Sequence, residues 1–205
     1  MTSTADANLG DVDRVVQAAR RCFVRYGAHR TTMEDIAAEA GIGRTGLYRL
    51  GMSRRQLAEA TIVARLREGR DLLWPLMERD LDFVTIMVEG SAAAIDWARN
   101  DPEFQALVGT TKTVQLHHLL IGRDAAMHDL ILSVCRKVFA EARDAGQMRA
   151  DVSDDRAIDW IQSIYLVLLL RDDITIDETK DLLRDFLMPA LASLSLLQEL
   201  GHGGG

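Results

Sequence analysis

The stretch TMEDIAAEAGIGRTGLY, residues 32–48, combines an amphipathic segment, a glycine-containing break and a second short segment. Ile36 and Ala37 fall where one apolar face of a helix requires them, so the first segment predicts a helix. Gly41 ends that helix, and Ile42 supplies an apolar residue that can fill the bend. A short turn with glycine between two helices, the second one exposed, is the geometry of a helix-turn-helix.

Two threonines precede this motif, and either can cap its first helix. Thr32 has Asp35 three residues later, and Thr31 has Glu34 at the same spacing. In both registers a hydroxyl and a carboxylate can bind the free amides at the start of the helix. The sequence therefore predicts a capped start at residue 31 or 32.

The rest of the chain shows helical periodicity, and no segment shows strand alternation bounded by hairpin turns. Capping residues mark further starts at Ser53, at Asp101 before Pro102, at Ser153 or Asp154, and at Asp177. The predicted helices cover residues 12–26, 33–40, 44–50, 54–74, 81–99, 102–108, 112–121, 124–145, 154–170 and 178–197. The expected fold class is all-α.

The same stretch contains the pattern G-x-G-x-x-G at Gly41, Gly43 and Gly46. A dinucleotide-binding fingerprint requires a β-strand directly before the pattern. Here a capped amphipathic helix precedes it, so we do not expect a nucleotide cofactor, and no other cofactor is expected.

Residues 11–57 resemble the TetR family of transcription regulators. The matching positions are Ala18, Ala19, Phe23, Gly27, Thr31, Thr32, Ile36, Ala37, Ala40, Gly41, Ile42, Leu47, Tyr48, Ser53, Arg54 and Leu57. Residues 146–151 and Trp160 resemble, more loosely, the turn and the helix that follow in the C-terminal part of this family.

The resemblance implies a DNA interface on the N-terminal helices. It implies phosphate contacts from Thr32, Tyr48 and Arg54, because a hydroxyl, a phenol and a guanidinium near helix starts suit phosphate. Arg44, Thr45 and Arg49 are the candidates for contacts to base edges, since arginine pairs well with guanine.

The resemblance also implies a C-terminal domain with an apolar effector cavity and a dimer interface on its last two helices. Candidates for the effector site are Trp74, Met87, Ser91, Trp97, Phe104, His117, Met127, Trp160 and Tyr165. Candidates for the dimer interface are Leu166, Leu183, Phe186, Leu187, Leu191 and Leu194. A plain hydrophobic core is the alternative explanation for the aromatic and methionine residues.

The charge of the chain is divided unequally between its two parts. Its net charge of −7 is the sum of +4 over residues 1–70 and −11 over residues 71–205. All twelve basic residues of the first part are arginines. A basic N-terminal part is expected to meet phosphate, whereas the acidic remainder is not.

Other classes of protein fit the sequence less well. Cys22 and Cys135 are far apart and suggest neither a disulfide framework nor a zinc site. His117, His118, His128 and Asp129 lack the i, i+4 spacing of helical metal ligands, so no metal is expected. No apolar run reaches membrane-spanning length, and residues 1–9 do not resemble a signal peptide, so we expect a cytoplasmic location.

The sequence thus favours a bacterial transcription regulator of the TetR type. We expect a homodimeric repressor that binds a palindromic operator and is released by a small, largely apolar effector. The expected divisions are disordered residues 1–10, a DNA-binding domain at 11–57, an effector-binding and dimerisation domain at 58–200, and a disordered tail at 201–205. The alternatives are a helical adaptor that binds protein through the N-terminal domain and an all-helical enzyme, which lacks any recognisable nucleophile–base pair.

Overall fold

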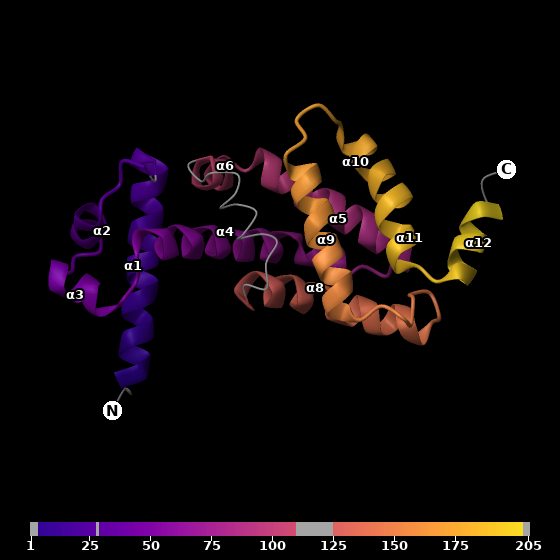
Figure 1. Ribbon diagram of the computed structural model, residues 1–205, viewed down its shortest axis with the longest axis horizontal. Coiled ribbons are helices and arrows are strands. Elements are labelled where there is room, and N and C mark those ends of the chain that lie inside the picture. Colours follow the sequence, from indigo (N-terminus) through magenta and orange to yellow (C-terminus); the bar gives the residue numbers. More distant parts are fainter. Residues whose placement is uncertain (1–3, 28, 110–124, 203–205) are drawn as a thin grey trace. The chain divides into compact units, whose positions relative to one another are not determined.

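A computed structural model of the protein describes residues 4–27, 29–109 and 125–202 (Figure 1). At residues 4–9, 44, 48, 125–127 and 200–202 it describes the backbone alone. Every regular element in these ranges is helical, and no β-strand occurs there. The prediction of an all-α fold, with an N-terminal helix-turn-helix and a helical C-terminal domain, is confirmed.

The described residues group into two compact units. Those within 1–66 and 101–116 form the N-terminal unit, and those within 67–100 and 117–205 form the C-terminal unit. The helix α4, Arg54–Met77, contributes to both units. The domain boundaries expected from the sequence remain predictions.

The N-terminal unit contains α1 (Thr4–Tyr26), α2 (Met33–Glu39), α3 (Arg44–Arg49), the first part of α4, and α6 (Pro102–Val108). Helix α1 packs against α2 and α6, and α2 packs against α3. The side chains that hold this unit together are buried and apolar: Val15, Ala18, Ala19, Phe23, Ile36, Leu47 and Leu57. Helix α1 begins earlier than the predicted start at residue 12 and runs through part of the segment expected to be disordered.

Ion pairs between distant parts of the sequence join α1, α4 and α6 within this unit. Arg20 Nη2 of α1 donates to Glu103 Oε2 at 2.6 Å. Arg65 Nε of α4 donates to Asp101 Oδ1 at 2.9 Å, and its Nη2 donates to Asp101 Oδ2. Asp101 also caps α6 by accepting a 2.7 Å hydrogen bond from the amide of Phe104. We call Arg20, Arg65, Asp101 and Glu103 the α6 ion-pair cluster.

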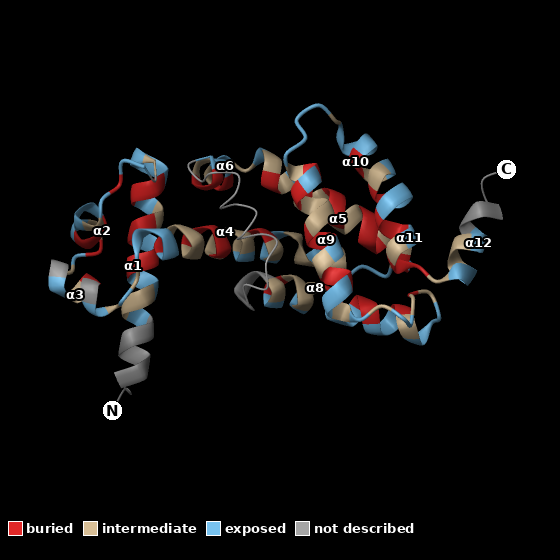
Figure 2. Cartoon of the chain, viewed as in Figure 1, coloured by how far each residue is buried: buried red, intermediate tan, exposed pale blue. Residues whose placement is uncertain are grey.

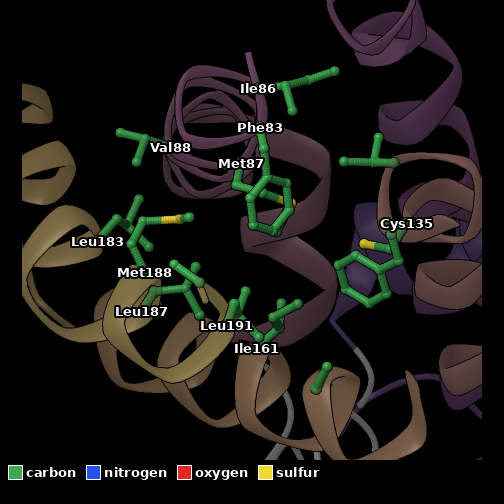
Figure 3. Close-up of a cluster of buried hydrophobic side chains, with 14 of the residues drawn as sticks. Phe83, Ile86, Met87, Val88, Cys135, Ile161, Leu183, Leu187, Met188 and Leu191 are labelled. Atoms are coloured by element: carbon green, nitrogen blue, oxygen red, sulfur yellow. The ribbon is translucent and has the colours of Figure 1, made fainter. Parts of the chain in front are cut away.

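The C-terminal unit contains the rest of α4, α5 (Phe83–Asn100), α8 (Ala125–Asp144), α9 (Asp154–Leu169), α10 (Ile176–Leu182), a π-helical turn η1 (Leu183–Leu187), α11 (Met188–Leu191) and α12 (Leu194–His202). Figure 2 shows buried positions where α5, α9 and α11 converge. The core of this unit also draws on α8 and η1. It includes Phe139 and, labelled in Figure 3, Phe83, Met87, Cys135, Ile161, Leu183, Leu187 and Leu191.

Two predicted helix boundaries are wrong. Helix α4 does not end before Pro75 but continues to Met77. A proline in the last turn of a helix removes one backbone donor, and the next amides can still find acceptors. Here the amide of Glu78 donates to the carbonyl of Trp74 at 3.2 Å, so the turn around Pro75 is retained.

The last predicted helix, 178–197, is also wrong in its start and in its continuity. Thr175, not Asp177, caps α10, and its hydroxyl and amide share a capping box with Glu178. The helix then passes through η1 and stops at Ala192, where ψ is 147°. The carbonyl of Leu191 accepts from the amide of Arg149 at 2.9 Å, so backbone pairing with the preceding loop replaces helical bonds there. The predicted helix at 112–121 lies outside the described residues.

Candidate nucleic-acid interface

Helix α2 begins at the capping box expected from the sequence, and Thr32 is the residue that caps it. Thr32 Oγ1 accepts from the amide of Asp35 at 3.1 Å, and Asp35 Oδ2 accepts from the amide of Thr32 at 2.8 Å. Two hydrogen bonds donated by Thr32 lower the pKa of Asp35. The bond from the Thr32 amide has the larger effect, and the bond from the Thr32 hydroxyl has the smaller one. Thr31 is fully buried instead, and its hydroxyl donates to the carbonyl of Gly27 at 2.9 Å.

The bend between α2 and α3 depends on Gly41. Its φ of +65° lies in the left-handed region, which glycine enters without the penalty that a Cβ imposes. The next amide, of Ile42, donates to the carbonyl of Ala37 at 3.1 Å and closes the end of α2. Leu47 of α3 is buried, and α3 packs against α2, so α3 has an inner face.

Helix α3 leaves its other face in solvent. Thr45 and Arg49 are both exposed on it. Arg44 is the first residue of α3 and Tyr48 lies within it, but their side chains lie outside the described part of the structure. Gly51, with φ of +67°, ends the element in the same left-handed conformation as Gly41.

The start of α4 lies close to the loop before α2. Ser53 and Gln56 form the capping box that the sequence predicts, with the Ser53 amide donating to Gln56 Oε1 at 2.9 Å. Arg54 is exposed, and its Nη1 donates to the carbonyls of Thr31 at 3.3 Å and His29 at 3.4 Å. The guanidinium of Arg54 is therefore held beside the N-terminus of α2 and next to the exposed Thr32.

A salt bridge fixes the other end of α2 to α1. Arg21 Nε donates to Glu39 Oε1 at 2.6 Å. This hydrogen bond from Arg21 is the largest cause of the lowered pKa of Glu39. These contacts connect the two ends of α2 to α1 and to the start of α4.

The candidates for the effector site fall into several separate places. Ser91 of α5 and Tyr165 of α9 meet, with the Tyr165 hydroxyl donating to Ser91 Oγ at 2.8 Å. Met87 is buried in the core against which Tyr165 packs. The ring of Trp97 lies over Gly69 of α4.

Other effector candidates do not join that group. The Trp74 indole, in the last turn of α4, donates at 2.7 Å to Oε1 of Glu78, the residue that directly follows this helix. Phe104 is fully buried in α6 and belongs to the N-terminal unit. His117 and the side chain of Met127 lie outside the described residues. Gln162, which sequence reasoning did not single out, is also buried in α9; polar Asp159 and Ser163 lie near it in the sequence, so no signal there distinguishes it.

Trp160 is exposed and borders a surface hollow rather than the core. The hollow has a volume of about 400 Å³ and is lined by Arg149, Val152, Arg156, Ala157, Asp159, Trp160, Ser163, Ala190 and Leu191. It lies entirely within the C-terminal unit. The structure thus separates Trp160 from the Ser91–Tyr165 pair.

The candidates for the dimer interface divide into buried and exposed residues. Leu166, Leu183, Leu187 and Leu191 are buried within the C-terminal unit, where they form part of the protomer's own core. Phe186 and Leu194 are exposed, with 60% and 79% of their surface accessible. Two further apolar residues that sequence reasoning did not name are exposed: Val167 in α9, and Leu170, which directly follows this helix.

Neither a cluster of metal-binding side chains nor a membrane-spanning helix occurs among the described residues. In the part of the chain that the structure describes, no three histidine, cysteine, aspartate or glutamate side chains gather as metal ligands would. Within the same residues, no helix has the length and apolar character needed to cross a membrane.

Comparison with known families decides the identity of the helix-turn-helix. Residues 15–61 match the family described as bacterial regulatory proteins, tetR family. The resemblance to the TetR family is confirmed. The match spans α1, α2, α3 and the beginning of α4, which are the elements that build the candidate interface.

Solved structures of TetR-family regulators share the fold over most of this chain. A regulator from Pectobacterium atrosepticum has a TM-score of 0.65 at 17% identity, covering 92% of this chain and 97% of that one. The R. erythropolis transcriptional repressor QsdR has a TM-score of 0.64 at 17% identity, covering 87% and 94%. A putative tetR family regulator from Shewanella sp. PV-4 has a TM-score of 0.59 at 20% identity, covering 89% and 98%. No curated protein sequence matches the chain.

Proposed function

We propose that this TetR-like protein is a transcription repressor that binds a palindromic DNA operator as a homodimer and is released by a small, largely apolar effector. The observation that carries the proposal is the α2–α3 elbow, which buries Leu47 and leaves Thr45 and Arg49 in solvent. An exposed second helix of a helix-turn-helix is the element that enters the major groove. Such a protein acts in the cytoplasm, where bacterial DNA lies.

The surroundings of Thr32 suit a DNA phosphate. Thr32 is exposed at the start of α2, and threonine hydroxyls are among the groups that contact DNA phosphates. Arg54 adds a positive charge at the same place, because it is held by the carbonyl of Thr31. Contacts to phosphate fix the register of a protein on DNA without reading its sequence. Thr32, Arg54 and Tyr48 are the residues we assign to this role.

We assign recognition of the DNA bases to the exposed face of α3. Arg49 and Arg44 can each donate two hydrogen bonds to a guanine, and Thr45 can contact a thymine methyl group or a base edge. Arg49 is exposed, and no ion pair of Arg49 occurs among the described residues. Its guanidinium is therefore available to a base.

DNA binding by Arg49→Ala tests this role. We expect the variant to bind DNA from the region upstream of its own gene about 10-fold more weakly, because one bidentate base contact contributes roughly 1–3 kcal/mol. Fluorescence anisotropy with labelled DNA measures the affinity. A titration with salt should give a steep fall in wild-type affinity, as release of counterions requires.

Arg171→Ala is the matched control for Arg49→Ala. Arg171 is also exposed, but it lies in the C-terminal unit and pairs with Asp173. We expect its DNA affinity to equal that of the wild type. Equal affinities of Arg49→Ala and the wild type for DNA would show that α3 does not recognise the bases. Absence of any specific complex between the wild type and DNA would refute the proposed function.

The homodimer is assigned to exposed apolar side chains of the C-terminal unit. Helix α9 exposes Trp160, Val167 and, at its end, Leu170, and η1 exposes Phe186. Several large apolar side chains left in solvent are typical of a surface that binds another protein. Two copies related by a two-fold axis would present two α3 helices to a palindromic operator.

Phe186→Glu is expected to convert the protein from dimer to monomer at micromolar concentration. A charge introduced into an apolar interface must lose its water without gaining a partner, which weakens association. Analytical ultracentrifugation measures the change. Leu72→Glu is the control, because Leu72 of α4 is equally exposed but outside the assigned surface, and it should stay dimeric. A dimeric Phe186→Glu would place the interface elsewhere.

Release by an effector follows from a shift in population. If the effector binds more tightly to a conformation that does not fit the operator, it lowers the fraction of protein able to bind DNA. The Ser91–Tyr165 pair and the adjacent core of the C-terminal unit are where we place effector binding.

A further inference from the structure

Gln162 of α9 is a buried amide with no hydrogen-bond partner. Only 2% of its surface is accessible. Neither Nε2 nor Oε1 has a hydrogen-bond partner within the part of the chain that the structure describes. A buried side-chain amide offers two donor hydrogens and an acceptor oxygen, and each of them normally finds a partner. Both the donor Nε2 and the acceptor Oε1 of Gln162 are therefore unsatisfied, which is unusual for a buried side chain.

Packing alone gives no reason for glutamine at this position. Its neighbours Ile158, Ile161 and Leu166 on α9 are apolar and buried. A leucine or methionine of similar volume would fill the same space without an unsatisfied polar group. An unpaired amide in such surroundings is therefore better suited to a bound molecule than to the core of the protein.

A second polar group lies one helical turn further along α9. The Tyr165 hydroxyl donates to Ser91 Oγ at 2.8 Å, and Ser91 is buried. Residues at i and i+3 of a helix are neighbours on its surface, so Gln162 and Tyr165 share a face. Burial raises the pKa of Tyr165, which keeps its hydroxyl protonated at every physiological pH.

The polar groups at this position are all uncharged: a carboxamide, a phenol and an alcohol. The nearby thiol of Cys135 is uncharged as well, since burial raises its pKa to about 12. An ionised ligand would lose its water here without gaining an opposite charge, which is strongly unfavourable. A neutral ligand that both donates and accepts hydrogen bonds matches the unpaired atoms of Gln162.

We propose that Gln162 recognises a neutral amide edge, such as that of a primary carboxamide or a lactam, carried by an effector with an apolar body. Two antiparallel hydrogen bonds join the two amides: Gln162 Nε2 donates to the ligand carbonyl, and Gln162 Oε1 accepts from the ligand N–H. Met87 and Ile161 lie in the same core (Figure 3), and the flexible side chain of Met87 can adapt to the apolar body of the ligand. This inference rests on the proposed function, because it defines the ligand class of the effector site.

Three small probes separate the possible kinds of recognition. Hexanamide both donates and accepts, methyl hexanoate only accepts, and hexanoate is charged. Ligand-observed NMR and thermal shift, measured with the full chain, report their binding. We expect hexanamide to bind at least about 10-fold more tightly than methyl hexanoate, because the ester leaves one buried polar atom unpaired. Hexanoate should bind most weakly. Equal binding of amide and ester, or absence of hexanamide binding, would overturn the proposal.

Variants of Gln162 then assign the effect to this residue. Gln162→Leu and Gln162→Met should each lose the preference for hexanamide over methyl hexanoate. Their melting temperatures should rise by about 3 °C in the absence of ligand, because an unsatisfied buried amide is removed. Gln17→Leu makes the same change at an exposed position of α1 and should leave the preference intact. Retained preference in both Gln162 variants contradicts the proposal.

Tyr165→Phe tests the neighbouring hydroxyl. We expect a smaller loss of hexanamide binding, roughly 3-fold, because the hydroxyl contributes one neutral hydrogen bond at the edge of the site. A loss larger than that of Gln162→Leu would transfer recognition to the Tyr165–Ser91 pair and overturn the role of Gln162.

DNA binding of the same samples separates this inference from the proposed function. Gln162→Leu should bind the operator as the wild type does and lose only the release by hexanamide. If the wild type binds hexanamide selectively but binds no DNA, the proposed function fails and the amide site stands. If it binds DNA but shows no selectivity among the probes, the amide site fails and the proposed function stands.

Discussion

Asp101→Ala is expected to lower the free energy of unfolding by about 3 kcal/mol, the effect of breaking a buried ion pair and losing a helix cap together. The Asp101 carboxylate serves both interactions. It accepts from the Phe104 amide at 2.7 Å at the start of α6 and from Arg65 Nε at 2.9 Å. Alanine removes both at once.

Burial makes this pair stronger than an ordinary surface salt bridge. The side chains of Arg65 and Asp101 are 16% and 9% accessible. Without Asp101, the Arg65 guanidinium loses a two-point partner in a largely buried place where water replaces it poorly, and losing such a partner is costly. Glu103, at 3.6 Å from Arg65, is too distant to form the same pair of hydrogen bonds.

Asp151→Ala provides a matched control for Asp101→Ala. Asp151 forms the same two-point pair, with Arg149 Nε at 3.0 Å and Nη2 at 2.7 Å. However, the side chains of Arg149 and Asp151 are 40% and 69% accessible, so water and salt screen their attraction. Urea unfolding should show a change within about 0.5 kcal/mol for Asp151→Ala. Similar losses in the two variants would contradict the role of burial.

The same carboxylate makes stability depend on pH. The hydrogen bond from Arg65 is the largest cause that lowers the pKa of Asp101 in the folded protein. A carboxyl whose pKa is lower folded than unfolded stabilises the fold above its unfolded value, near pH 4, and loses this contribution as pH falls through its folded value. The difference in the free energy of unfolding between the wild type and Asp101→Ala should therefore shrink as the pH falls from 7 to 3. A constant difference across that range would rule out this origin of the stability.

Local signals in the sequence predicted the N-terminal motif well, because each depends on residues within four positions of one another. The capping pairs Thr32–Asp35 and Ser53–Gln56 and the turn at Gly41 all lie where the spacing places them. The competition between Thr31 and Thr32 needed the structure, since burial of Thr31 against α1 takes its hydroxyl out of the cap.

Features that depend on distant partners could not be predicted. Arg20 and Glu103 are 83 positions apart, and nothing in either segment signals the other. The break at Ala192 has the same cause, because the loop at Arg149 provides the backbone partner that stops the helix. Periodicity alone indicated one continuous helix there, and it could not show that Leu183 and Leu187 are buried in the protomer's own core.

The candidate sites follow the same division. The residues proposed to contact DNA come from one short stretch and one motif, so sequence reasoning could name them, and their roles stay predictions. The candidates for the effector site come from several helices, and composition could not separate core residues from site residues. Gln162 stands out only once its burial and its unpaired atoms are known.

Gly69→Ala is expected to lower the free energy of unfolding by about 2 kcal/mol, because α5 leaves no room for a methyl group at this position of α4. A Cβ on Gly69 would lie 2.5 Å from Cη2, 2.6 Å from Cζ3 and 2.7 Å from Cζ2 of Trp97. The indole is rigid, so relief requires the whole ring to rotate or the two helices to separate. The higher helix propensity of alanine, worth up to about 1 kcal/mol, offsets only part of this strain.

Gly90→Ala separates lack of space from the effect of glycine itself. A Cβ on Gly90 would lie 2.7 Å from Sδ of Met77, the end of a flexible side chain that can rotate away. This variant should therefore be neutral or more stable by up to about 1 kcal/mol, as helix propensity alone predicts. Thermal unfolding measures the stability of both variants. A double-mutant cycle then compares the effect of Gly69→Ala in the wild type with its effect in Trp97→Leu. In the background of Trp97→Leu, Gly69→Ala should no longer destabilise, because the smaller side chain removes the clash. A loss that persists there would show that the indole is not the cause.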